Sequence, residues 1–453
     1  MSAPVNEPGE GLRGLLERLD LPALGAELHA GVQALYPICR SITGDGLRQS
    51  LRLLQQTAPI VLHEVPTGTQ VFDWVVPREW NFRSARLVGP DGAVVLDAAR
   101  LNLHLLNYSV PFRGRVSREE LEAHLYSLPE APTLVPYRTS YYREAWGFCL
   151  SHAQRTALPA GDYQVEVDTS LAPGALTYGE LLLRGAEDRE VLISTHCCHP
   201  SLANDNCAGM VMCAALARLL ADVSRRYTYR FLFVPGTIGA ITWLAQNEAA
   251  AGRVAHGLVA ACAGDAGQLT YKRSRRGDAE IDRAVALVLR DSGQEHRIRD
   301  FTPYGYDERQ YCSPGFDLPV GSLTRTPYGE YPEYHTSADD PALVRPDALA
   351  DTLRRYLEVF EVLEDNRTYR NLQPKCEPQL GKRGLYGAVG GQSHAVPSQM
   401  AMLWVLNQSD GSRSLLDVAE RSGLPFPELS RAARALERGG LLSEERSGRG
   451  APR

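Results

Sequence analysis

The chain has 453 residues, of which 44% are hydrophobic and 23% charged, and its formal net charge is −6. This length exceeds what one simple core holds and favours two or three domains, and the composition is ordinary for a soluble globular protein. The acidic balance leaves no global basic field, which argues against a protein built to bind nucleic acid or an anionic membrane surface.

The N-terminus and the cysteines bear on the cellular compartment. The N-terminal residues include acidic side chains and lack the apolar core of a signal peptide. No uninterrupted apolar stretch approaches the ~20 residues of a membrane span. Nine cysteines in a long chain without a secretion signal are typical of reduced thiols and not of a disulfide framework. We therefore expect a cytoplasmic protein that does not bind membranes.

Residues 1–70 are expected to form the N-terminal helical part of the main domain. Apolar residues show helical spacing from residue 47 to residue 54, after turn and cap chemistry at residues 41–44. Contacts between helices explain this segment by themselves. Alternatively, Arg40 beside the turn can hold an anionic group of a substrate.

Residues 71–170 differ in character and predict an inserted, mostly β subdomain. Short β-rich runs alternate with Gly, Pro and Asp turns, namely VFDWVVP, SARLVG, AVVLDA and YQVEVDT. The segment has no obvious catalytic cluster. Its aromatic residues, among them Tyr141 and Tyr142, can line a pocket, although ordinary core burial explains them equally well.

Residues 171–370 predict an α/β core. The expected strands are VLISTH, YRFLFVP, GLVAACAG, HRIRDFTP and LPVGSLT. The expected helices span residues 207–222, 238–251, 281–291 and 346–363. Apolar strands without alternation indicate a sheet that is covered on both faces. Ligands of such sheets bind at the carboxyl ends of the strands, which is where the polar residues of interest fall.

The remaining residues predict a linker and a small C-terminal domain. Residues 371–396 are rich in Gly, Pro and Gln, as is typical of a linker. Residues 397–453 carry three short helical patterns and a final apolar pair, which is the order of elements in a winged-helix domain. The last of these helices mixes basic and acidic side chains. Because a helix that reads DNA usually has a clearer basic face, we expect this domain to contact protein and not nucleic acid.

A metal site is predicted where the strands of the α/β core end. His196 and His199 follow the strand VLISTH, and Asp205 precedes a helix whose N-terminal dipole favours an anion. Asp265 follows the strand GLVAACAG, and His335 lies in a Tyr-rich loop before the last helix of this region. Zinc prefers imidazole nitrogen and carboxylate oxygen, and two neighbouring ions need a shared carboxylate. Each residue alone has a structural explanation, such as helix capping, but the ordered set indicates a metal site.

These motifs carry a resemblance to a known family. HPSLANDNCAG, ACAGDAG and YHTSAD, in this order, resemble the metal motifs of co-catalytic zinc aminopeptidases. More closely, the chain resembles, from about residue 30 to residue 445, a bacterial aminopeptidase-like family with CHPS and AND motifs, an inserted small domain and a C-terminal winged helix. LYPICRSITGDG, PGTIGAITWL and YDERQYCSPGFDLPVGS contribute to the likeness. The resemblance implies a zinc-aminopeptidase-like mixed sheet flanked by helices, with an inserted β subdomain and a winged-helix domain.

Carried over residue by residue, the resemblance implies a set of zinc ligands. Asp205 matches the bridging carboxylate, Asp265 the carboxylate of a second metal, and His335 the last imidazole ligand. The first imidazole ligand is either His199, which matches the CHPS motif and which we prefer, or His196, which matches by its place at the strand end. The expected cofactor is one Zn²⁺ ion or two.

One departure from the family pattern concerns the general base. Zinc aminopeptidases carry two successive glutamates after the strand that corresponds to YRFLFVP, one as base and one as ligand, whereas this chain has Gly236 there. A base commonly contributes about 10²–10⁴-fold to the rate. Glu308 is the expected substitute, followed by Glu333 and Glu330, although Glu308 can equally form a surface ion pair with Arg309. The missing ligand also makes a single metal ion compatible with the pattern.

The sequence thus predicts a zinc-dependent hydrolase that cleaves an amide bond of a small peptide, or of an aminoacyl or acyl metabolite, through metal-activated water. Asp339 and Asp340 are expected to orient the imidazole of His335. The residues expected to bind the substrate are Arg40, Tyr304, Tyr306, Tyr311 and Tyr334. The alternative is a non-catalytic metal-binding or regulatory protein on a peptidase scaffold, which uses its winged helix for contact with a partner or DNA. The sequence leaves homo-oligomerisation open.

Overall fold

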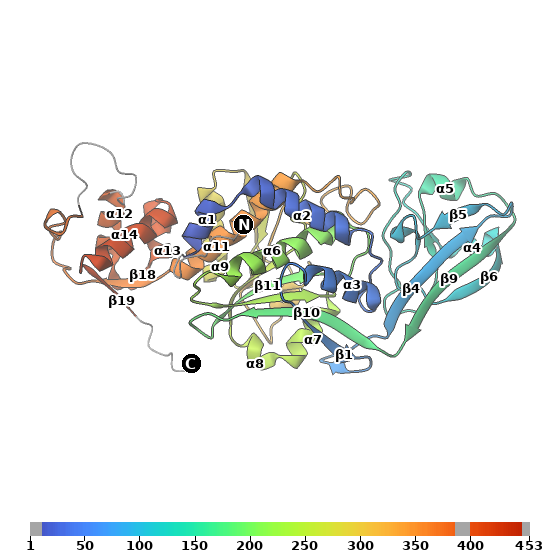
Figure 1. The fold of residues 1–453 in the computed structure, drawn as a ribbon, viewed down its shortest axis with the longest axis horizontal. Helices are drawn as coiled ribbons and strands as arrows, with labels where there is room; N and C mark the ends of the chain where they lie inside the picture. Colours follow the sequence, from blue (N-terminus) through green and yellow to red (C-terminus); the bar gives the residue numbers. More distant parts are fainter. Residues whose placement is uncertain (1–10, 386–398, 446–453) are drawn as a thin grey trace, which may run out of the picture. The chain divides into compact units, whose positions relative to one another are not determined.

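The computed structural model describes residues 11–385 and 399–445 (Figure 1). Contacts divide the chain into two units, which are treated separately below. The first comprises Met1–Ala279 and Glu295–Arg354, and the second comprises Glu280–Gln294 and Arg355–Arg453. None of the described helices is long and apolar enough to cross a membrane.

An eight-stranded mixed sheet forms the centre of the first unit. Its strands, in spatial order, are β1 (Val61–Pro66), β10 (Ala175–Leu183), β12 (Thr228–Val234), β11 (Glu190–His196), β13 (Val254–Ala260), β16 (Val320–Thr324), β14 (Leu269–Lys272) and β15 (His296–Arg299). Strands β12, β11, β13 and β16 run parallel to one another, whereas β1 and β10 on one side pair antiparallel with their neighbours. On the other side, β14 is antiparallel to β16 and parallel to β15. The predicted mixed α/β sheet is confirmed.

The central strands are buried on both faces, as their uninterrupted apolar sequences predict. Every residue of β11 and of β12 is buried. Helices α2 (Leu21–Leu35) and α6 (Gly209–Ala221) cover one face, and α7 (Ile238–Gln246) and α8 (Glu248–Ala251) cover the other (Figure 1). The expected single helix over residues 238–251 is therefore two helices, because Asn247 between them leaves the helical conformation, with φ −137° and ψ 35°.

The parallel strands bring three chain segments to one edge of the sheet. His196, the last residue of β11, pairs in register with Val234, the last residue of β12. Ser194 of β11 lies opposite Val259 near the end of β13. The loops that follow these strands therefore start side by side at the carboxyl edge.

The chain segment that connects β1 to β10 forms a second, smaller sheet, although β1 and β10 themselves are neighbours in the main sheet. Its order is β5 (Val94–Asp97), β4 (Glu79–Val88), β9 (Asp162–Ala172) and β6 (Phe112–Ser117). Alternate residues of β9 are buried, which is the period of two that a strand with one solvated face requires. The short elements around it are β2 (Gln70–Val71), β3 (Trp74–Val75), η1 (Asn102–His104), α4 (Arg118–Glu122), β7 (Leu125–Tyr126), β8 (Phe148–Cys149) and α5 (His152–Thr156).

Three further helices complete the first unit, two in its N-terminal part and one before β16. These are α1 (Leu12–Arg18), α3 (Asp45–Leu54) and the short α10 (Glu308–Tyr311). The long helix α11 (Pro346–Asp365) begins in the first unit and ends in the second.

The second unit contains the winged helix that the sequence predicts. Helices α12 (Gln399–Gln408), α13 (Leu415–Ser422) and α14 (Phe426–Arg438) accompany a three-stranded antiparallel sheet of order β18 (Asp410–Ser414), β17 (Thr368–Asn371) and β19 (Leu442–Glu444). A capping box at Ser414 and Asp417 begins α13, and Gly423 in the left-handed conformation ends it. Helix α9 (Glu280–Asp291) and the single turn η3 (Gly381–Arg383) also belong to this unit, whereas the predicted linker lies partly outside the described residues.

Candidate metal centre

The candidate centre is built on the connection from β11 to α6. His196 ends β11, a short loop carries His199, and the irregular turn η2 (Ala203–Ala208) leads into α6. Asp205 in this turn has φ −112° and ψ 76°, which is outside the helical region. Asp339 fixes the turn from outside, because its carboxylate accepts hydrogen bonds from the backbone N–H of Asn204 at 2.6 Å and of Asp205 at 3.1 Å.

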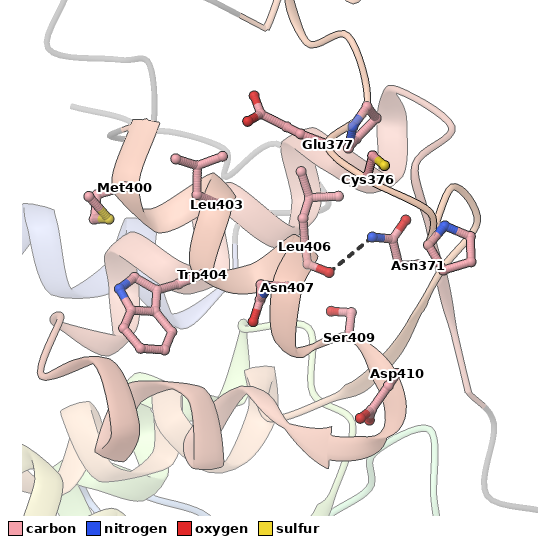
Figure 2. A pocket seen from close by; sticks show the side chains of 12 residues that line it. Asn371, Cys376, Glu377, Met400, Leu403, Trp404, Leu406, Asn407, Ser409 and Asp410 are labelled. Atoms are coloured by element: carbon pink, nitrogen blue, oxygen red, sulfur yellow. Dashed lines mark hydrogen bonds between the residues drawn. The ribbon is translucent and has the colours of Figure 1, made fainter.

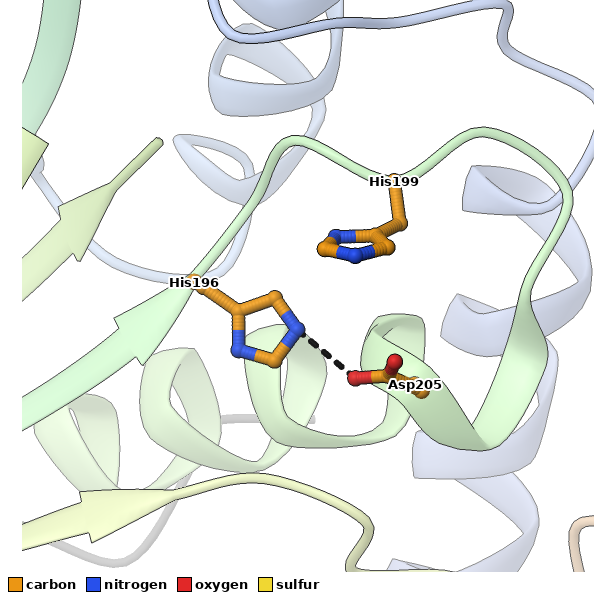
Figure 3. Close-up of side chains that lie close together, drawn as sticks. All are labelled: His196, His199 and Asp205. Carbon is orange, nitrogen blue, oxygen red and sulfur yellow. Dashed lines mark hydrogen bonds and ion pairs between the residues drawn. The ribbon is translucent and has the colours of Figure 1, made fainter. Parts of the chain in front are cut away.

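Three imidazoles surround the carboxylate of Asp205. His196 Nε2 lies 2.7 Å from one oxygen of Asp205, and His335 Nε2 lies 3.0 Å from the other. One ligand atom each of His196, His199 and Asp205 lie within 4.8 Å of one another (Figure 3). The ring of His199 is 5.2 Å from that of His335, centre to centre. The structure thus brings together four of the five residues expected to bind metal.

The protonation states of the cluster suit a cation. Burial, with smaller contributions from His196 and His335, lowers the pKa of His199 well below its usual value, so its ring is neutral. Burial alone would raise the pKa of Asp205. The charges of His196 and His199, with the hydrogen bonds from His196 and His335, outweigh burial and hold the pKa of Asp205 well below its usual value. An ionised Asp205 and a neutral His199 are in the state in which a carboxylate and an imidazole bind metal.

Neighbouring side chains hold the imidazole of His199 and the backbone of His196. Cys198 Sγ lies 3.2 Å from His199 Nδ1, which leaves Nε2 of His199 for a ligand. The amide of Asn206 donates to the backbone carbonyl of His196 at 3.1 Å and to Thr195 Oγ1 at 2.8 Å. The loop and the turn are therefore tied to the end of β11.

Asp265 lies outside this cluster and is engaged elsewhere. Its carboxylate accepts hydrogen bonds from Asn204 Nδ2 at 3.0 Å, from the N–H of Gly267 at 2.7 Å, and from the N–H and hydroxyl of Thr326 at 3.2 and 2.6 Å. Both carboxylate oxygens thus already have donors. Asp265 is linked to the centre through Asn204, the residue before Asp205.

The expectation that Asp339 and Asp340 orient His335 is wrong. Asp339 accepts from the backbone of the η2 turn, as described above, and from the hydroxyl of Tyr331 at 3.2 Å. Asp340 caps its own turn by accepting from the N–H of Ala342 at 2.8 Å. The two carboxylates therefore hold the backbone of their loops.

Glu308 is fully buried and bound to a lysine. Lys272 Nζ lies 2.6 Å from its carboxylate, and the hydroxyl of Tyr328 donates to it at 2.9 Å. The backbone N–H of Tyr306 is 3.1 Å from both of its oxygens. The surface ion pair with Arg309, which was the structural alternative, is replaced by this buried pair with Lys272, because the loop turns the side chain inward.

The other two glutamates named as bases differ in their surroundings. Glu333 is partly exposed, and its side chain forms no ion pair or hydrogen bond among the residues that the structure describes. Glu330 forms an ion pair with Arg299. Glu333 also lies on the turn that carries His335, since the N–H of Thr336 donates to its backbone carbonyl at 3.1 Å.

Position 236, where the family pattern has a carboxylate, is filled by an aromatic ring. A Cβ atom added to Gly236 would lie 2.6 Å from both Cζ and the hydroxyl oxygen of Tyr306, closer than real Cβ contacts allow. The ring of Tyr306 packs on His196 with 3.9 Å between ring centres. Burial raises the pKa of Tyr306 well above its usual value, so the phenol is a neutral hydrogen-bonding group.

The remaining residues expected to bind the substrate have different surroundings. Tyr334 stacks on His335 with ring centres 3.9 Å apart and an interplanar angle of 13°. Tyr304 is 78% exposed, whereas Tyr311 is fully buried and hydrogen-bonded to Ser194 Oγ at 2.9 Å. Arg40 is 1% exposed and donates to the carbonyl of Leu35, to Ser50 Oγ and to Cys207 Sγ, so its guanidinium supports the η2 turn from inside.

One residue of the centre was not anticipated from the sequence. The ring of Tyr137, in the inserted segment, is 5.0 Å from those of both His199 and His335. Its N–H donates to the backbone carbonyl of His335 at 2.7 Å, and its hydroxyl is 2.9 Å from that of Tyr141. An isolated tyrosine in a loop carries no signal of this kind in the sequence, because the contact depends on a residue about two hundred positions away.

Two cavities complete the description. A cavity of about 140 Å³ lies beside Gly236 and is lined by Ile42, Trp74, Tyr141, Tyr142, Gly236, Thr237, Ile238 and Ile241. A larger one, of about 620 Å³, lies in the second unit beside α12 (Figure 2). It is lined by Met400, Leu403, Trp404 and Cys376, among others, and its polar residues do not form a cluster of metal-binding side chains.

The donor set of the first unit fits zinc. Imidazole nitrogens and one carboxylate oxygen, converging within 4.8 Å in a buried site, are the ligands that this ion takes with tetrahedral geometry. Asp265 lies outside this donor set, and its oxygens accept hydrogen bonds from Asn204, Gly267 and Thr326.

Comparison with known proteins identifies relatives over nearly the whole chain. A family model described as a domain of unknown function (DUF4910) matches residues 29–366, and a winged helix-turn-helix model matches residues 367–444. A protein from Clostridium acetobutylicum is 48% identical over 418 residues, or 92% of this chain and 96% of that protein. Its provisional name is polysaccharide biosynthesis protein with aminopeptidase-like domain.

Solved structures share the fold. The crystal structure of a provisionally named peptidase from Clostridium acetobutylicum has a TM-score of 0.91 at 45% identity, covering 96% of this chain and 100% of that one. A zinc aminopeptidase from Bacillus subtilis has a TM-score of 0.54 at 12% identity, covering 75% of this chain and 95% of that one. At such low identity the second likeness concerns the fold alone.

Proposed function

Because the chain belongs to the family of the DUF4910 domain, joined here to a winged helix-turn-helix, we propose that it is a zinc-dependent hydrolase that cleaves an amide bond. The aminopeptidase-like fold supports peptidase-type chemistry. The single observation that carries the proposal is the convergence of His196, His199 and His335 on the buried carboxylate of Asp205.

A single zinc ion is the form of the site that the side chains support best. His196, His199 and Asp205 would hold it, and His335 would fix the other oxygen of Asp205. Asp265 would act through Asn204 to hold the η2 turn, and not as a ligand of a second ion. Because both imidazoles lie near Asp205, the proposal uses His196 as well as His199 as a ligand.

The reaction is the addition of water to an amide carbonyl. A bound zinc ion supplies a Lewis acid for the carbonyl oxygen and lowers the pKa of water at the site. Water adds to the carbonyl carbon, which forms the new C–O bond and a tetrahedral oxyanion. The C–N bond then breaks, and the leaving amine takes up the proton that the water gave away. The buried histidines and Asp205 exclude bulk solvent from one side of the reacting carbonyl.

Glu333 is the more suitable of the two proposed bases. Glu308 is held by Lys272 and Tyr328, so taking a proton would cost it a buried ion pair. Glu333 has no such partner among the described residues and lies on the same turn as His335. We therefore assign proton acceptance to Glu333 and a positioning role to Glu308.

The surroundings of the centre favour a small substrate with an apolar group. Tyr137 and Tyr334 stand against the histidines, and the cavity of about 140 Å³ beside Gly236 is mostly apolar and aromatic. A cavity of this kind accepts one side chain or acyl group and fixes its orientation. The name of the Clostridium relative, which refers to polysaccharide biosynthesis, makes N-acylated amino sugars a substrate class worth including.

Metal analysis and an activity panel test this proposal. We expect the purified protein to bind one zinc per chain, and chelation to lower its melting temperature, because a ligand present at about 100 times its Kd stabilises by about 2.7 kcal/mol. The zinc-loaded protein should hydrolyse at least one member of a panel of aminoacyl p-nitroanilides, N-acyl amino acids and N-acyl amino sugars. Asp205→Asn should abolish both zinc binding and activity.

The control is Asp300→Asn, which changes a carboxylate whose side chain is 92% exposed. It should leave zinc stoichiometry and activity unchanged. If Asp205→Asn still binds zinc with wild-type affinity, or if the loaded protein cleaves no amide in the panel, the hydrolase proposal is refuted. Two zinc ions per chain would contradict the single-ion form.

A non-catalytic, regulatory protein on a peptidase scaffold is the second candidate. The observation that favours it is Gly236, which lacks the carboxylate of the zinc aminopeptidase pattern. Zinc binding without any hydrolysis would support this candidate. Retention of the whole imidazole and carboxylate cluster around Asp205 makes hydrolysis the preferred function.

A further inference from the structure

The space left by the missing side chain at position 236 is occupied and not empty. A Cβ atom on Gly236 would lie 2.6 Å from the ring carbon Cζ and the hydroxyl oxygen of Tyr306, and closer still to ring carbon Cε1. Real Cβ atoms essentially never approach another heavy atom within 3.0 Å. Tyr306 in this position and any side chain at position 236 therefore exclude each other.

Tyr306 is held in this place from two directions. Its ring packs on the imidazole of His196 at 3.9 Å with an interplanar angle of 38°. Its backbone N–H lies 3.1 Å from both oxygens of Glu308, which is itself fixed by Lys272 at 2.6 Å. The buried ion pair of Glu308 thus determines where the loop delivers the phenol ring.

The hydroxyl of Tyr306 has a weak partner in the present arrangement. Among the described residues, its hydrogen-bond partner is Cys198 Sγ at 3.4 Å, and a thiol sulfur is a poor hydrogen-bond acceptor. The residue as a whole is partly exposed, and its ring lies against the imidazole of His196. A phenol O–H beside a metal centre can donate to an oxygen that gains negative charge.

We propose that Tyr306 is a catalytic hydrogen-bond donor of this centre, and that Gly236 is required because the phenol ring takes the place of the side chain found there in zinc aminopeptidases. The hydroxyl donates to the carbonyl oxygen of the scissile amide as that oxygen becomes an oxyanion. It keeps its own proton, so the water proton still passes to a carboxylate. The inference rests on the proposed hydrolase function and adds a residue to it.

The alternative is that Tyr306 only fills space against His196. Tyr306→Phe separates the two roles, because it keeps the ring and removes the hydroxyl. A donor role predicts a fall in kcat of about 10²–10³-fold with little change in KM. A space-filling role predicts no change in kcat, since the ring contact with His196 is preserved.

The experiment compares five variants, one of them the double variant of Gly236→Ala and Tyr306→Phe, with the wild type on its best substrate from the panel. Tyr306→Phe is matched by Tyr369→Phe, which removes the phenol hydroxyl of a tyrosine in β17 of the second unit. Gly236→Ala is matched by Gly315→Ala, because a Cβ atom at Gly315 meets no heavy atom within 4 Å. Zinc stoichiometry, melting temperature and the affinity for an aminoalkylphosphonic acid, which mimics the tetrahedral oxyanion, are measured beside kcat and KM.

We expect Tyr306→Phe to keep one zinc per chain and the wild-type melting temperature, while kcat and phosphonate affinity fall. Gly236→Ala should lose at least as much kcat, because its Cβ atom displaces the ring. The double variant should lose no more than Gly236→Ala alone, since both changes remove the same hydroxyl. Neither matched control should change any readout.

Three results would overturn the inference and are distinguishable from failure of the hydrolase proposal. The first is wild-type kcat and phosphonate affinity in Tyr306→Phe. The second is loss of zinc in Tyr306→Phe, which would make the phenol a ligand. The third is full additivity of the two substitutions. All three presuppose an active wild type, whereas an inactive, zinc-loaded wild type refutes the proposed function itself.

Discussion

Asp307 is a buried carboxyl group without a hydrogen-bond partner among the residues that the structure describes. It is fully buried at the start of α10, and neither of its oxygens meets a donor. Burial, reinforced by the charge of Glu308, raises the pKa of Asp307 well above its usual value. The group is therefore protonated in the folded protein where an exposed aspartate would be ionised.

This state makes stability depend on pH in a defined direction. The folded protein binds a proton at Asp307 that the unfolded chain releases above about pH 4, so the free energy of unfolding falls as the pH rises from there. Asp307→Asn cannot titrate and should gain stability relative to the wild type over this range, by up to about 1.4 kcal/mol per pH unit. Urea unfolding of both proteins between about pH 4 and pH 8 measures the difference.

The matched control is Asp278→Asn, an exposed aspartate whose replacement should shift stability equally at every pH. Any constant offset caused by the new amide cancels, because only the pH dependence of the difference is read. A difference between Asp307→Asn and wild type that stays constant across the range would mean that the carboxylate is ionised and has a partner.

The sequence could predict the side chains that gather in the candidate metal centre but not their surroundings. His196, His199, Asp205 and His335 stand out because imidazoles and a carboxylate follow predicted strands at the edge where ligands bind. Asp265 has the same signal, yet it accepts hydrogen bonds from its own loop and from Thr326. Such a competition between donors is decided by loop geometry, which short-range patterns do not encode.

The exchange between Gly236 and Tyr306 shows the same limit. The missing carboxylate is visible in the sequence, but the ring that replaces it comes from a loop some seventy residues later. Glu308 was predicted to be a base because it is a carboxylate near the site. Its burial against Lys272 follows from the antiparallel pairing of β14 with β16, which no local pattern predicts.

At the scale of elements, the start of α6 is packed so closely that it leaves no room for a side chain at residue 209. A Cβ atom on Gly209 would lie 2.6 Å from the backbone oxygen of Ala260 at the end of β13, and it would also meet the side-chain amide of Asn206. Asn206 accepts from the N–H of Gly209 at 3.1 Å. The η2 turn, α6 and β13 can meet this closely only because residue 209 has no side chain.

Gly209→Ala should therefore destabilise the protein by about 1–3 kcal/mol, the usual cost of overfilling a close-packed site. It should also weaken zinc binding, because the shift must move the turn that holds Asp205. Urea unfolding and zinc titration measure the two effects. Gly252→Ala is the matched control, since its Cβ atom would have only ordinary contacts at 3.6 Å, and wild-type behaviour of Gly209→Ala would contradict the steric argument.

The accuracy of the element predictions follows from how each element is stabilised. The central strands β11, β12, β13 and β16 were predicted because burial on both faces imposes continuous apolar runs. The short strand β14, with the sequence LTYK, was not predicted, because a strand of four residues is too short to show a periodic pattern. Strands β17 and β18 of the winged helix were missed for the same reason, whereas its three helices were predicted from their apolar spacing.

At the scale of the whole molecule, the centre depends on segments far apart in the chain. The loop after β11, the turn of His335 and the Tyr137 loop of the inserted segment meet at one edge of the main sheet. Backbone hydrogen bonds from Tyr137 to His335, and from Ser337 to Val135, join the inserted segment to the loop that carries His335. The insertion between β1 and β10 is therefore part of the candidate site and not only an appendage.

The last prediction concerns the winged helix, whose fold alone suggests contact with DNA. On α14, Arg434 is already paired with Asp365 at 2.5 Å, and Glu428 and Glu437 lie on the same helix as the two other arginines, Arg431 and Arg438. Phosphate binding requires unpaired cationic side chains in excess.

We therefore expect the affinity of the protein for duplex DNA to be no tighter than the nonspecific range, with a Kd of about 10⁻⁴–10⁻⁶ M. Fluorescence anisotropy of a labelled duplex, titrated with wild type and Arg431→Glu at about 50 and 200 mM salt, measures it. Tight, salt-sensitive binding that Arg431→Glu abolishes would contradict this prediction and assign the second unit to nucleic acid.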